Sequence, residues 1–147
     1  MSLLRVKYLS FFFILISIFS FFNIIFSYYF NLYLNLNTYY FSFVLSAVIG
    51  LIFYKIKVIE KKPSIFEKIF TVLLGYILMP LILSIPFYLS IYNLTFLNAF
   101  FESVSGFTST GFTIFENIKH IDQSLILWRS FIQWIGGLYF LYSIIFL

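Results

Sequence analysis

The uncharged apolar stretch from Tyr8 to Phe30, which directly follows Lys7, most constrains what this chain can fold into. As an α-helix its 23 residues would extend about 34 Å, enough to cross a hydrocarbon core of about 30 Å. Of the whole chain, 63% is hydrophobic and 10% charged, whereas soluble domains are about 45–50% apolar and about 25% charged. We therefore predict an integral membrane protein that keeps Tyr8–Phe30 as its first anchor, because the run is too long for a signal peptide.

Later apolar segments predict three further membrane helices, at Tyr39–Tyr54, Ile69–Tyr92 and Ser124–Leu147. Pro80 and Pro86 lie inside the third span and predict kinks, for which we favour a role in packing over the alternative of a role in gating. Another segment, Phe96–Ser105, predicts a helix too short to span a bilayer. The predicted fold class is an all-α integral membrane protein, with four transmembrane helices plus one re-entrant pore helix and its filter loop.

Two short patterns predict local structure within this plan. Ser46-x-x-x-Gly50 is a small-xxx-small pattern, which lets membrane helices approach closely. Ser64 and Glu67 have the spacing of a capping box, which predicts a helix start just after the polar loop Lys55–Lys68.

Residues Phe100–Thr113 bring hydroxyl groups, one carboxylate and two glycines into the middle of this apolar chain. Non-helical backbone is tolerated at membrane depth only where protein covers it or where it lines a water-filled cavity. We therefore predict a re-entrant loop in which backbone carbonyls replace the water around a permeating cation. When successive carbonyls point toward one axis, their residues alternate between negative and positive φ. Gly111 suits such a loop, because glycine adopts a positive φ without strain.

Lysine and arginine are unevenly distributed between the connections. Two lie in Met1–Lys7 and five in Lys55–Lys68, whereas Asn31–Thr38 has none and Ile114–Gln123 has one. By the positive-inside rule, the N-terminus and the lysine-rich loop are cytoplasmic. The third span then runs outward, so the re-entrant loop enters from the external side.

Two blocks of sequence carry a resemblance to a known family. The segment Phe101–Gly111 (Phe-Glu-Ser-Val-Ser-Gly-Phe-Thr-Ser-Thr-Gly) resembles the first pore loop of the Trk/Ktr/HKT superfamily of potassium transporters. The second block, Leu127–Gly137 (Leu-Trp-Arg-Ser-Phe-Ile-Gln-Trp-Ile-Gly-Gly), follows at the spacing of that family. Ser109–Thr113 occupies the place of the potassium-channel filter Thr-Val-Gly-Tyr-Gly, with Thr113 where that filter has its last glycine.

The resemblance implies a TrkH-type membrane subunit, in which each of four repeats has an outer helix, a pore helix with its filter loop, and an inner helix. Residues 1–57 would form two extra N-terminal helices, residues 58–68 a basic cytoplasmic loop, and residues 69–147 the first repeat, truncated at its C-terminus. The implied function is potassium uptake across the bacterial inner (cytoplasmic) membrane. Phe112 would wedge the filter loop from behind, and potassium would bind the backbone carbonyls of Thr108, Ser109, Thr110 and Gly111.

One loop supplies only one of the four sets of carbonyls that surround an ion in a filter. We therefore expect the chain to be an N-terminal part of a longer transporter. The resemblance implies several partners: the remaining pore repeats, a second copy of the full-length protein in a dimer, membrane lipid and a cytosolic nucleotide-binding regulatory subunit. Two alternatives stay open, namely a homotetrameric cation channel in which each chain donates one loop, and a non-transporting membrane scaffold that kept the motif by descent.

The sequence disfavours several other classes of function. It contains no cysteine, which excludes disulfides and thiol chemistry. Its single histidine, His120, has no second metal ligand at a suitable spacing and is interpreted as a surface residue. Because no nucleophile–base pair is visible, we predict neither an enzyme nor a cofactor. The net charge of +4 suggests no nucleic-acid partner.

Arg129 is the one charge inside the fourth predicted span. A charged side chain in a membrane helix is unfavourable and usually has a partner, although snorkelling to the outer surface is the alternative. Glu102, in the predicted pore helix, is the only carboxylate between Glu67 and the loop after the filter. We predict a bidentate Glu102–Arg129 pair that ties the inner helix to the pore helix and supports the filter.

Overall fold

The structure is a computed structural model, and it describes residues 7–56, 64–116 and 121–147, which form helices and loops without a strand. The long helices are α1 (Lys7–Tyr29), α2 (Leu36–Lys55), α3 (Ile65–Leu83) and α6 (Gln123–Phe146). Two shorter helices, α4 (Ile85–Tyr88) and α5 (Phe96–Phe107), lie between α3 and α6. Each predicted helix is present, and the prediction of an all-helical fold is confirmed.

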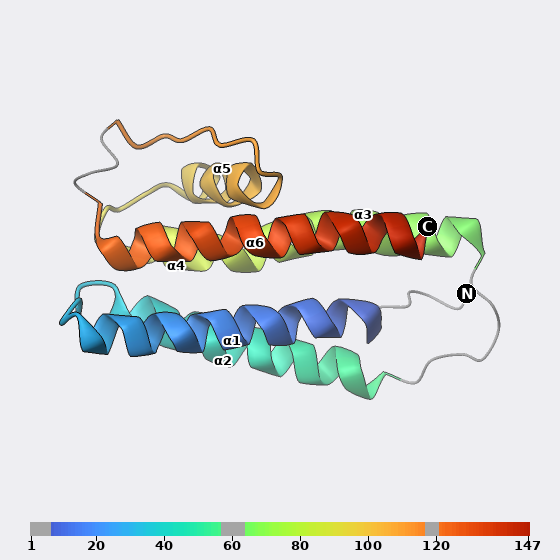
Figure 1. The fold of residues 1–147 in the computed structure, drawn as a ribbon, viewed down its shortest axis with the longest axis horizontal. Coiled ribbons are helices and arrows are strands. Elements are labelled where there is room, and N and C mark those ends of the chain that lie inside the picture. Colours follow the sequence, from blue (N-terminus) through green and yellow to red (C-terminus); the bar gives the residue numbers. More distant parts are fainter. Residues whose placement is uncertain (1–6, 57–63, 117–120) are drawn as a thin grey trace.

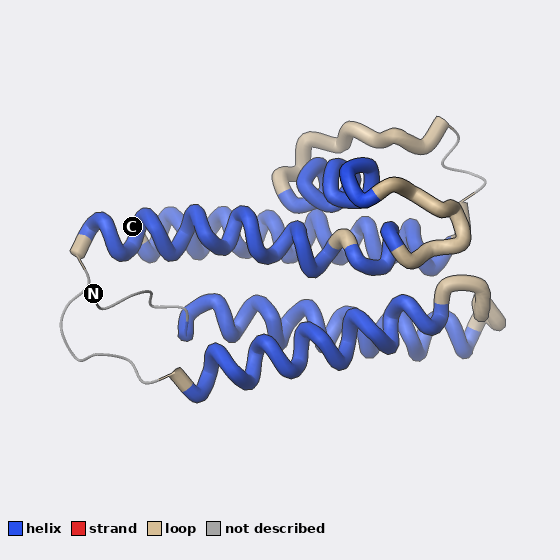
Figure 2. The backbone as a smooth tube through the Cα atoms, turned by 180° about the vertical axis from the view of Figure 1, so that it is seen from behind, coloured by secondary structure: helices blue, strands red, loops and turns tan. Residues whose placement is uncertain are grey.

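The helices run along a common axis in three layers (Figures 1 and 2). α1 and α2 form one outer layer, α6 lies with α3 and α4 in the middle layer, and α5 with its following loop forms the other outer layer. The start of α1 and the end of α6 lie at the same end of the molecule. The middle layer thus separates the N-terminal helix pair from α5.

Within the described ranges, three helical segments are long and apolar enough to cross a membrane: Lys7–Tyr29, Leu36–Lys55 and Ile65–Tyr88. The chain is therefore a multi-pass membrane protein. α6 has 24 residues but is not among these segments. Its apolar sequence is interrupted by polar residues that include Arg129 and Gln133, so the fourth span stays a prediction.

The α1–α2 contact shows why small residues matter in this fold. Between membrane helices, lipid removes most of the hydrophobic drive, so close packing replaces it. A Cβ atom at Gly50 would lie 3.2 Å from the backbone nitrogen of Ile14, and Ser46 is fully buried one turn earlier. The close approach predicted for this pattern is confirmed.

The starts of α2 and α3 both differ from the predicted spans. α3 begins at Ile65, because Ser64 and Glu67 form the predicted capping box, with the Glu67 backbone N–H donating to Ser64 Oγ at 3.3 Å. α2 begins at Leu36 rather than Tyr39, which shortens the predicted Asn31–Thr38 turn. Half of the lysine-rich loop, residues 57–63, lies outside the described residues.

The third predicted span is broken at Ser84, between Pro80 inside α3 and Pro86 at the start of α4. Proline lacks the backbone N–H that would bond the carbonyl four residues earlier, which interrupts the regular helix here. Two side chains of neighbouring helices donate to carbonyls beside the break. Here the Ser103 hydroxyl of α5 donates to the Pro80 carbonyl, and the Trp128 indole of α6 donates to the Leu83 carbonyl at 3.1 Å. The break therefore serves as a contact point for both helices of the candidate site.

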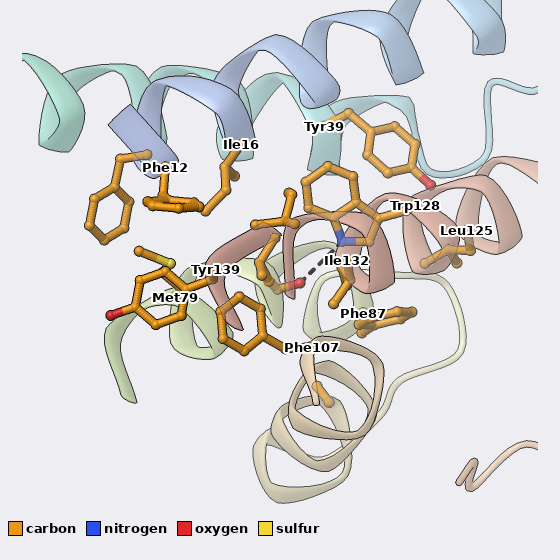
Figure 3. Packing of buried hydrophobic residues seen from close by; sticks show 14 of the residues in the cluster. Phe12, Ile16, Tyr39, Met79, Phe87, Phe107, Leu125, Trp128, Ile132 and Tyr139 are labelled. Carbon is orange, nitrogen blue, oxygen red and sulfur yellow. Dashed lines mark hydrogen bonds between the residues drawn. The ribbon is translucent and has the colours of Figure 1, made fainter. Parts of the chain in front are cut away.

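One face of α6 forms the centre of the buried core (Figure 3). Trp128, Ile132, Ile135 and Tyr139 recur at helical spacing on this face, and all four are 0% exposed. Phe12 and Tyr39 approach this face from α1 and α2, and Phe107 approaches it from α5 (Figure 3). α6 is thus packed against helices on both sides, which fixes its position relative to α5.

Candidate ion-binding loop

The chain between α4 and α6 makes an excursion that goes out and returns to the same end of the molecule (Figure 1). α5 has 12 residues and lies along α6, far shorter than the long helices beside it. After Phe107 the chain turns and runs back beside α5 toward the start of α6. The path is compatible with the predicted re-entrant segment, whose place in a membrane stays a prediction.

α5 begins where its sequence supplies a cap. Thr95 is the N-cap residue, and its hydroxyl accepts a hydrogen bond from the Asn98 backbone N–H at 3.3 Å. The C-terminal half of the helix is largely buried, with Glu102, Ser103, Ser105, Gly106 and Phe107 all covered. These residues, rather than the exposed first turn, set where the following loop begins.

The loop after α5 alternates the sign of φ. Ser109 has φ +57° and Gly111 has φ +80°, whereas Thr110 between them is not among the positive-φ residues of the described chain. The loop folds back on the helix end, because the N–H groups of Ser109 and Thr110 donate to the carbonyls of Gly106 and Ser105 at 3.0 and 3.1 Å. The alternation predicted at Gly111 is therefore present, and it extends to Ser109.

Three consecutive carbonyls of this loop are free. In the described part of the chain, the carbonyl oxygens of Thr108, Ser109 and Thr110 accept no hydrogen bond. All three residues are exposed. The Gly111 carbonyl differs, because it lies 3.4 Å from Arg129 Nη2, longer than the usual range of about 2.7–3.2 Å.

The next carbonyl, that of Phe112, is held firmly. It accepts hydrogen bonds from Ser105 Oγ at 2.6 Å and from Arg129 Nη2 at 2.8 Å. Phe112 is 69% exposed, so within this chain its ring does not pack behind the loop, and its place in a complete filter stays a prediction. Side chains from α5 and α6 support the loop instead, through its backbone.

Glu102 holds the segment that follows the loop. Its Oε1 atom accepts from the Thr113 hydroxyl and from the Ile114 backbone N–H, both at 2.6 Å. Thr113 is the position where the potassium-channel filter has a glycine, and its φ is not positive here. The Thr113 hydroxyl therefore joins this segment to α5 through Glu102.

The predicted contact between Glu102 and Arg129 is present, but its predicted bidentate geometry is wrong. Arg129 Nη1 lies 3.5 Å from Glu102 Oε2, while Nη2 is directed to the loop carbonyls. The Glu102 side chain is 0% exposed and that of Arg129 is 13% exposed. Arg129 therefore joins the buried Glu102 carboxylate to the loop backbone. Its Nη2 atom contacts the Gly111 and Phe112 carbonyls instead of making the predicted second contact with Glu102.

A hollow of about 380 Å³ lies beside the start of the loop, lined in part by Thr108, Ser109, Gly136 and Gly137. Gly136 allows the end of α5 to touch α6, because a Cβ atom there would lie 1.8 Å from the Phe107 carbonyl oxygen. A Cβ atom at Gly137 would meet nothing within 4 Å. Of the two adjacent glycines, Gly136 therefore lies at the contact with α5, whereas Gly137 faces open space.

Sequence reasoning missed three of the residues that shape this loop: Ser105, Thr113 and Gly136. Ser105 and Thr113 lie in the hydroxyl-rich segment, where spacing alone does not show which hydroxyl bonds to which carbonyl. Gly136 lies in the second family block, where the adjacent glycines Gly136 and Gly137 could have indicated a close approach between helices. His120 lies outside the described residues.

Curated relatives match parts of this chain. An uncharacterized cation transporter from Methanocaldococcus jannaschii is 42% identical over 64 residues, which are 44% of this chain and 14% of the relative. The Trk system potassium uptake protein TrkI from Halomonas elongata is 46% identical over 55 residues, which are 37% of this chain and 11% of the relative. TrkG from Escherichia coli, also a Trk system potassium uptake protein, is 37% identical over 68 residues, which are 46% of this chain and 14% of the relative. The matched segments span a small part of the length of these relatives.

A family match covers much more of the chain. The sequence model of the TrkH family, described as cation transport protein, matches residues 35–147. This region contains α2 to α6 and the whole excursion between α4 and α6. The chain therefore belongs to the TrkH family of cation transport proteins.

Proposed function

We propose that this chain supplies one of the four filter loops of a potassium transporter, and that the loop binds dehydrated potassium through the carbonyls of Thr108, Ser109, Thr110 and Gly111. The observation that carries this proposal is that the carbonyls of the exposed residues 108–110 accept no hydrogen bond in the described chain, beside a Phe112 carbonyl that accepts two. Carbonyl oxygens that take the place of an ion's hydration shell are the ligands of potassium filters. The names of the potassium uptake relatives support potassium as the cation.

The complete transporter would combine this chain with further repeats. One loop does not surround an ion, so we propose that the remaining pore repeats of a longer polypeptide complete the filter. Residues 69–147 would be the first repeat, and residues 1–57 two extra helices joined to it by the basic loop 58–68. We further propose a dimer with a cytosolic nucleotide-binding regulatory subunit, located in the bacterial cytoplasmic membrane.

The Gly111→Ser and Ser109→Gly variants of the complete transporter test the filter assignment. A Cβ atom at Gly111 would meet nothing within 4 Å, so the serine acts through backbone strain at φ +80° alone. We expect Gly111→Ser to lower potassium-over-sodium selectivity by about tenfold, equivalent to about 1.4 kcal/mol. Ser109→Gly removes a Cβ from a positive-φ position and should keep selectivity. Competitive uptake of rubidium against sodium measures both variants, and unchanged selectivity in Gly111→Ser contradicts the assignment.

The proposed orientation has its own test. The chain contains no cysteine, so single cysteines report one position each. Ile65 is 70% exposed at the start of α3, and Glu116 is exposed after the loop. We expect an impermeant thiol reagent to label Ile65→Cys from the cytoplasmic side and Glu116→Cys from the external side. Labelling of both cysteines from one side would rule out a re-entrant loop that enters from outside.

Native mass measurement separates the proposed transporter from a homotetrameric channel. A chain that assembles by itself into a four-subunit pore should show a mass of four protomers in detergent. A mass of one or two copies of a longer polypeptide agrees with repeats joined in one chain.

A further inference from the structure

The turn between α1 and α2 holds both ends of the excursion that carries the loop. Asn35, in this turn, is 1% exposed. Its Oδ1 atom accepts from the Ile91 backbone N–H at 3.1 Å, where the chain leaves α4 for α5. Its Nδ2 atom donates to Asp122 Oδ2 at 2.7 Å, where the chain returns to start α6. One buried side chain thus joins the exit and the return of the excursion.

The two ends are also joined directly. The Asp122 backbone N–H donates to the Tyr92 hydroxyl at 2.7 Å. Asp122 is also the N-cap of α6, and its Oδ1 atom accepts from the Ser124 backbone N–H at 3.1 Å. Asn35, Ile91, Tyr92 and Asp122, which we call the clasp, therefore fix where the excursion begins and where the inner helix starts.

Both N-terminal helices reinforce the clasp from beneath. Tyr39 of α2 shares a hydrogen bond of 2.8 Å with the Ser124 hydroxyl, and Asn23 of α1 donates to the Ser124 carbonyl at 3.0 Å. Ser124, Tyr39 and Asn23 are all 0% exposed. Leaving a buried polar group without its hydrogen-bond partner destabilises a protein more than the loss of an exposed hydrogen bond does. The buried Asn35 side chain and the buried contacts to Ser124 therefore support the clasp from within the protein.

We infer that Asn35 is a positioning residue for the filter loop, although it lies outside the pore-loop repeat. Because the excursion is anchored at both ends by the clasp, the clasp limits how far its middle can shift, and Thr108–Gly111 lies in that middle. This inference rests on the proposed function for its effect on ion selection. The structural part of the inference, that Asn35 orders the loop, can be tested without a transport measurement.

Asn35→Ala tests the structural part, with a spin label on Phe112→Cys as the probe. The Phe112 side chain is exposed, and the chain has no other cysteine. We expect Asn35→Ala to raise the mobility of this label and to leave a label at Leu51→Cys, which is 55% exposed on α2, unchanged. Asn37→Ala is the matched control, because Asn37 is exposed two residues further on and should leave both labels unchanged. Unchanged mobility at Phe112→Cys in a folded Asn35→Ala protein overturns the inference.

An exchange of the two side chains keeps the test decisive where single variants fold poorly. Asn35→Asp places two carboxylates face to face. Asp122→Asn leaves one side-chain oxygen for the Asn35 amide and the two Ser124 donors, which the aspartate serves with two oxygens. Each variant alone should therefore mobilise the loop label. Together they restore one amide and one carboxylate, with the new carboxylate able to accept from the Ile91 N–H. We expect the double variant to recover the label mobility of the unchanged protein. A double variant that is no better than the single ones excludes a clasp.

The KM for potassium uptake by the complete transporter is a second measurement, which should stay unchanged if Asn35 contributes only to folding. A loss of folded protein lowers the maximal rate, whereas a displaced filter raises the KM for potassium. We expect Asn35→Ala to raise that KM on the order of tenfold, and the double exchange to restore it. A mobile loop label with unchanged KM would keep the clasp and overturn the filter assignment. An unchanged label together with a changed KM would overturn the clasp alone.

Discussion

Gly136→Ala is expected to abolish most recovery of the folded protein, whereas Gly137→Ala should leave recovery unchanged. The added methyl carbon at position 136 would lie 1.8 Å from the Phe107 carbonyl oxygen and 2.8 Å from its Cα atom. These are backbone atoms at the end of α5, so no side-chain rotation relieves the clash. α5 and α6 would have to separate by more than an ångström before ordinary contact is restored. Overpacking typically costs about 1–3 kcal/mol, and a clash between two helix backbones belongs at the upper end.

The two glycines are adjacent, and both substitutions add the same methyl group to α6. At Gly137 the methyl carbon would meet no atom within 4 Å. The pair therefore separates contact with α5 from any change in helix propensity. The yield of monodisperse protein in detergent and its thermal unfolding midpoint are the measurements. Equal losses in both variants would show that α5 does not rest on α6 at Gly136.

Glu102→Gln and Arg129→Gln are each expected to be severe, and together less damaging than the sum of the two. The Glu102 carboxylate is 0% exposed and lies 3.5 Å from Arg129, so removal of either residue leaves the other charge without its partner. Such a loss typically costs about 3–5 kcal/mol. Arg129→Gln should be the worse of the two, because Arg129 also donates to the Phe112 carbonyl at 2.8 Å. A glutamine at 102 still presents an oxygen to Thr113 and Ile114.

A double-mutant cycle on unfolding free energy measures this coupling. Arg129→Lys supplies a useful comparison, because lysine keeps the charge without a second donor arm for the loop carbonyl. We expect it to retain part of the coupling to Glu102 and to lose order in the loop. Strictly additive losses for Glu102→Gln and Arg129→Gln would show that the pair contributes no coupling energy.

Much of this fold could be predicted because its signals are local in the sequence. The uncharged run that became α1 and the Ser64–Glu67 capping box each depend on residues close together along the chain. The Glu102–Arg129 contact could also be predicted, since few charges lie at membrane depth and each needs a partner. The family assignment followed from two short blocks, and the match over residues 35–147 confirms it.

The rest depends on which atoms meet between elements, and no local pattern specifies that. Asn35 looks like an ordinary turn residue, but its side chain joins Ile91 and Asp122, which are far from it in sequence. The second arm of Arg129 bonds to the Phe112 carbonyl rather than Glu102, because the fold brings that carbonyl nearer. Phe112 was expected to pack behind the loop, but hydrogen bonds to its backbone support the loop while its ring stays exposed.

The contact between α3 and α6 has a mechanical consequence. The Tyr139 hydroxyl donates to the Val72 carbonyl at 2.9 Å, and it occupies the space that a side chain at Gly75 would need. α6 is thus hydrogen-bonded to the backbone of α3, and it packs closely against the backbone of α5 at Gly136. Neither α3 nor α5 can slide along α6 without breaking these contacts. α3, α5 and α6 should therefore move as one rigid unit, so that any conformational change displaces them together and is taken up by the segments that connect them to the rest of the chain.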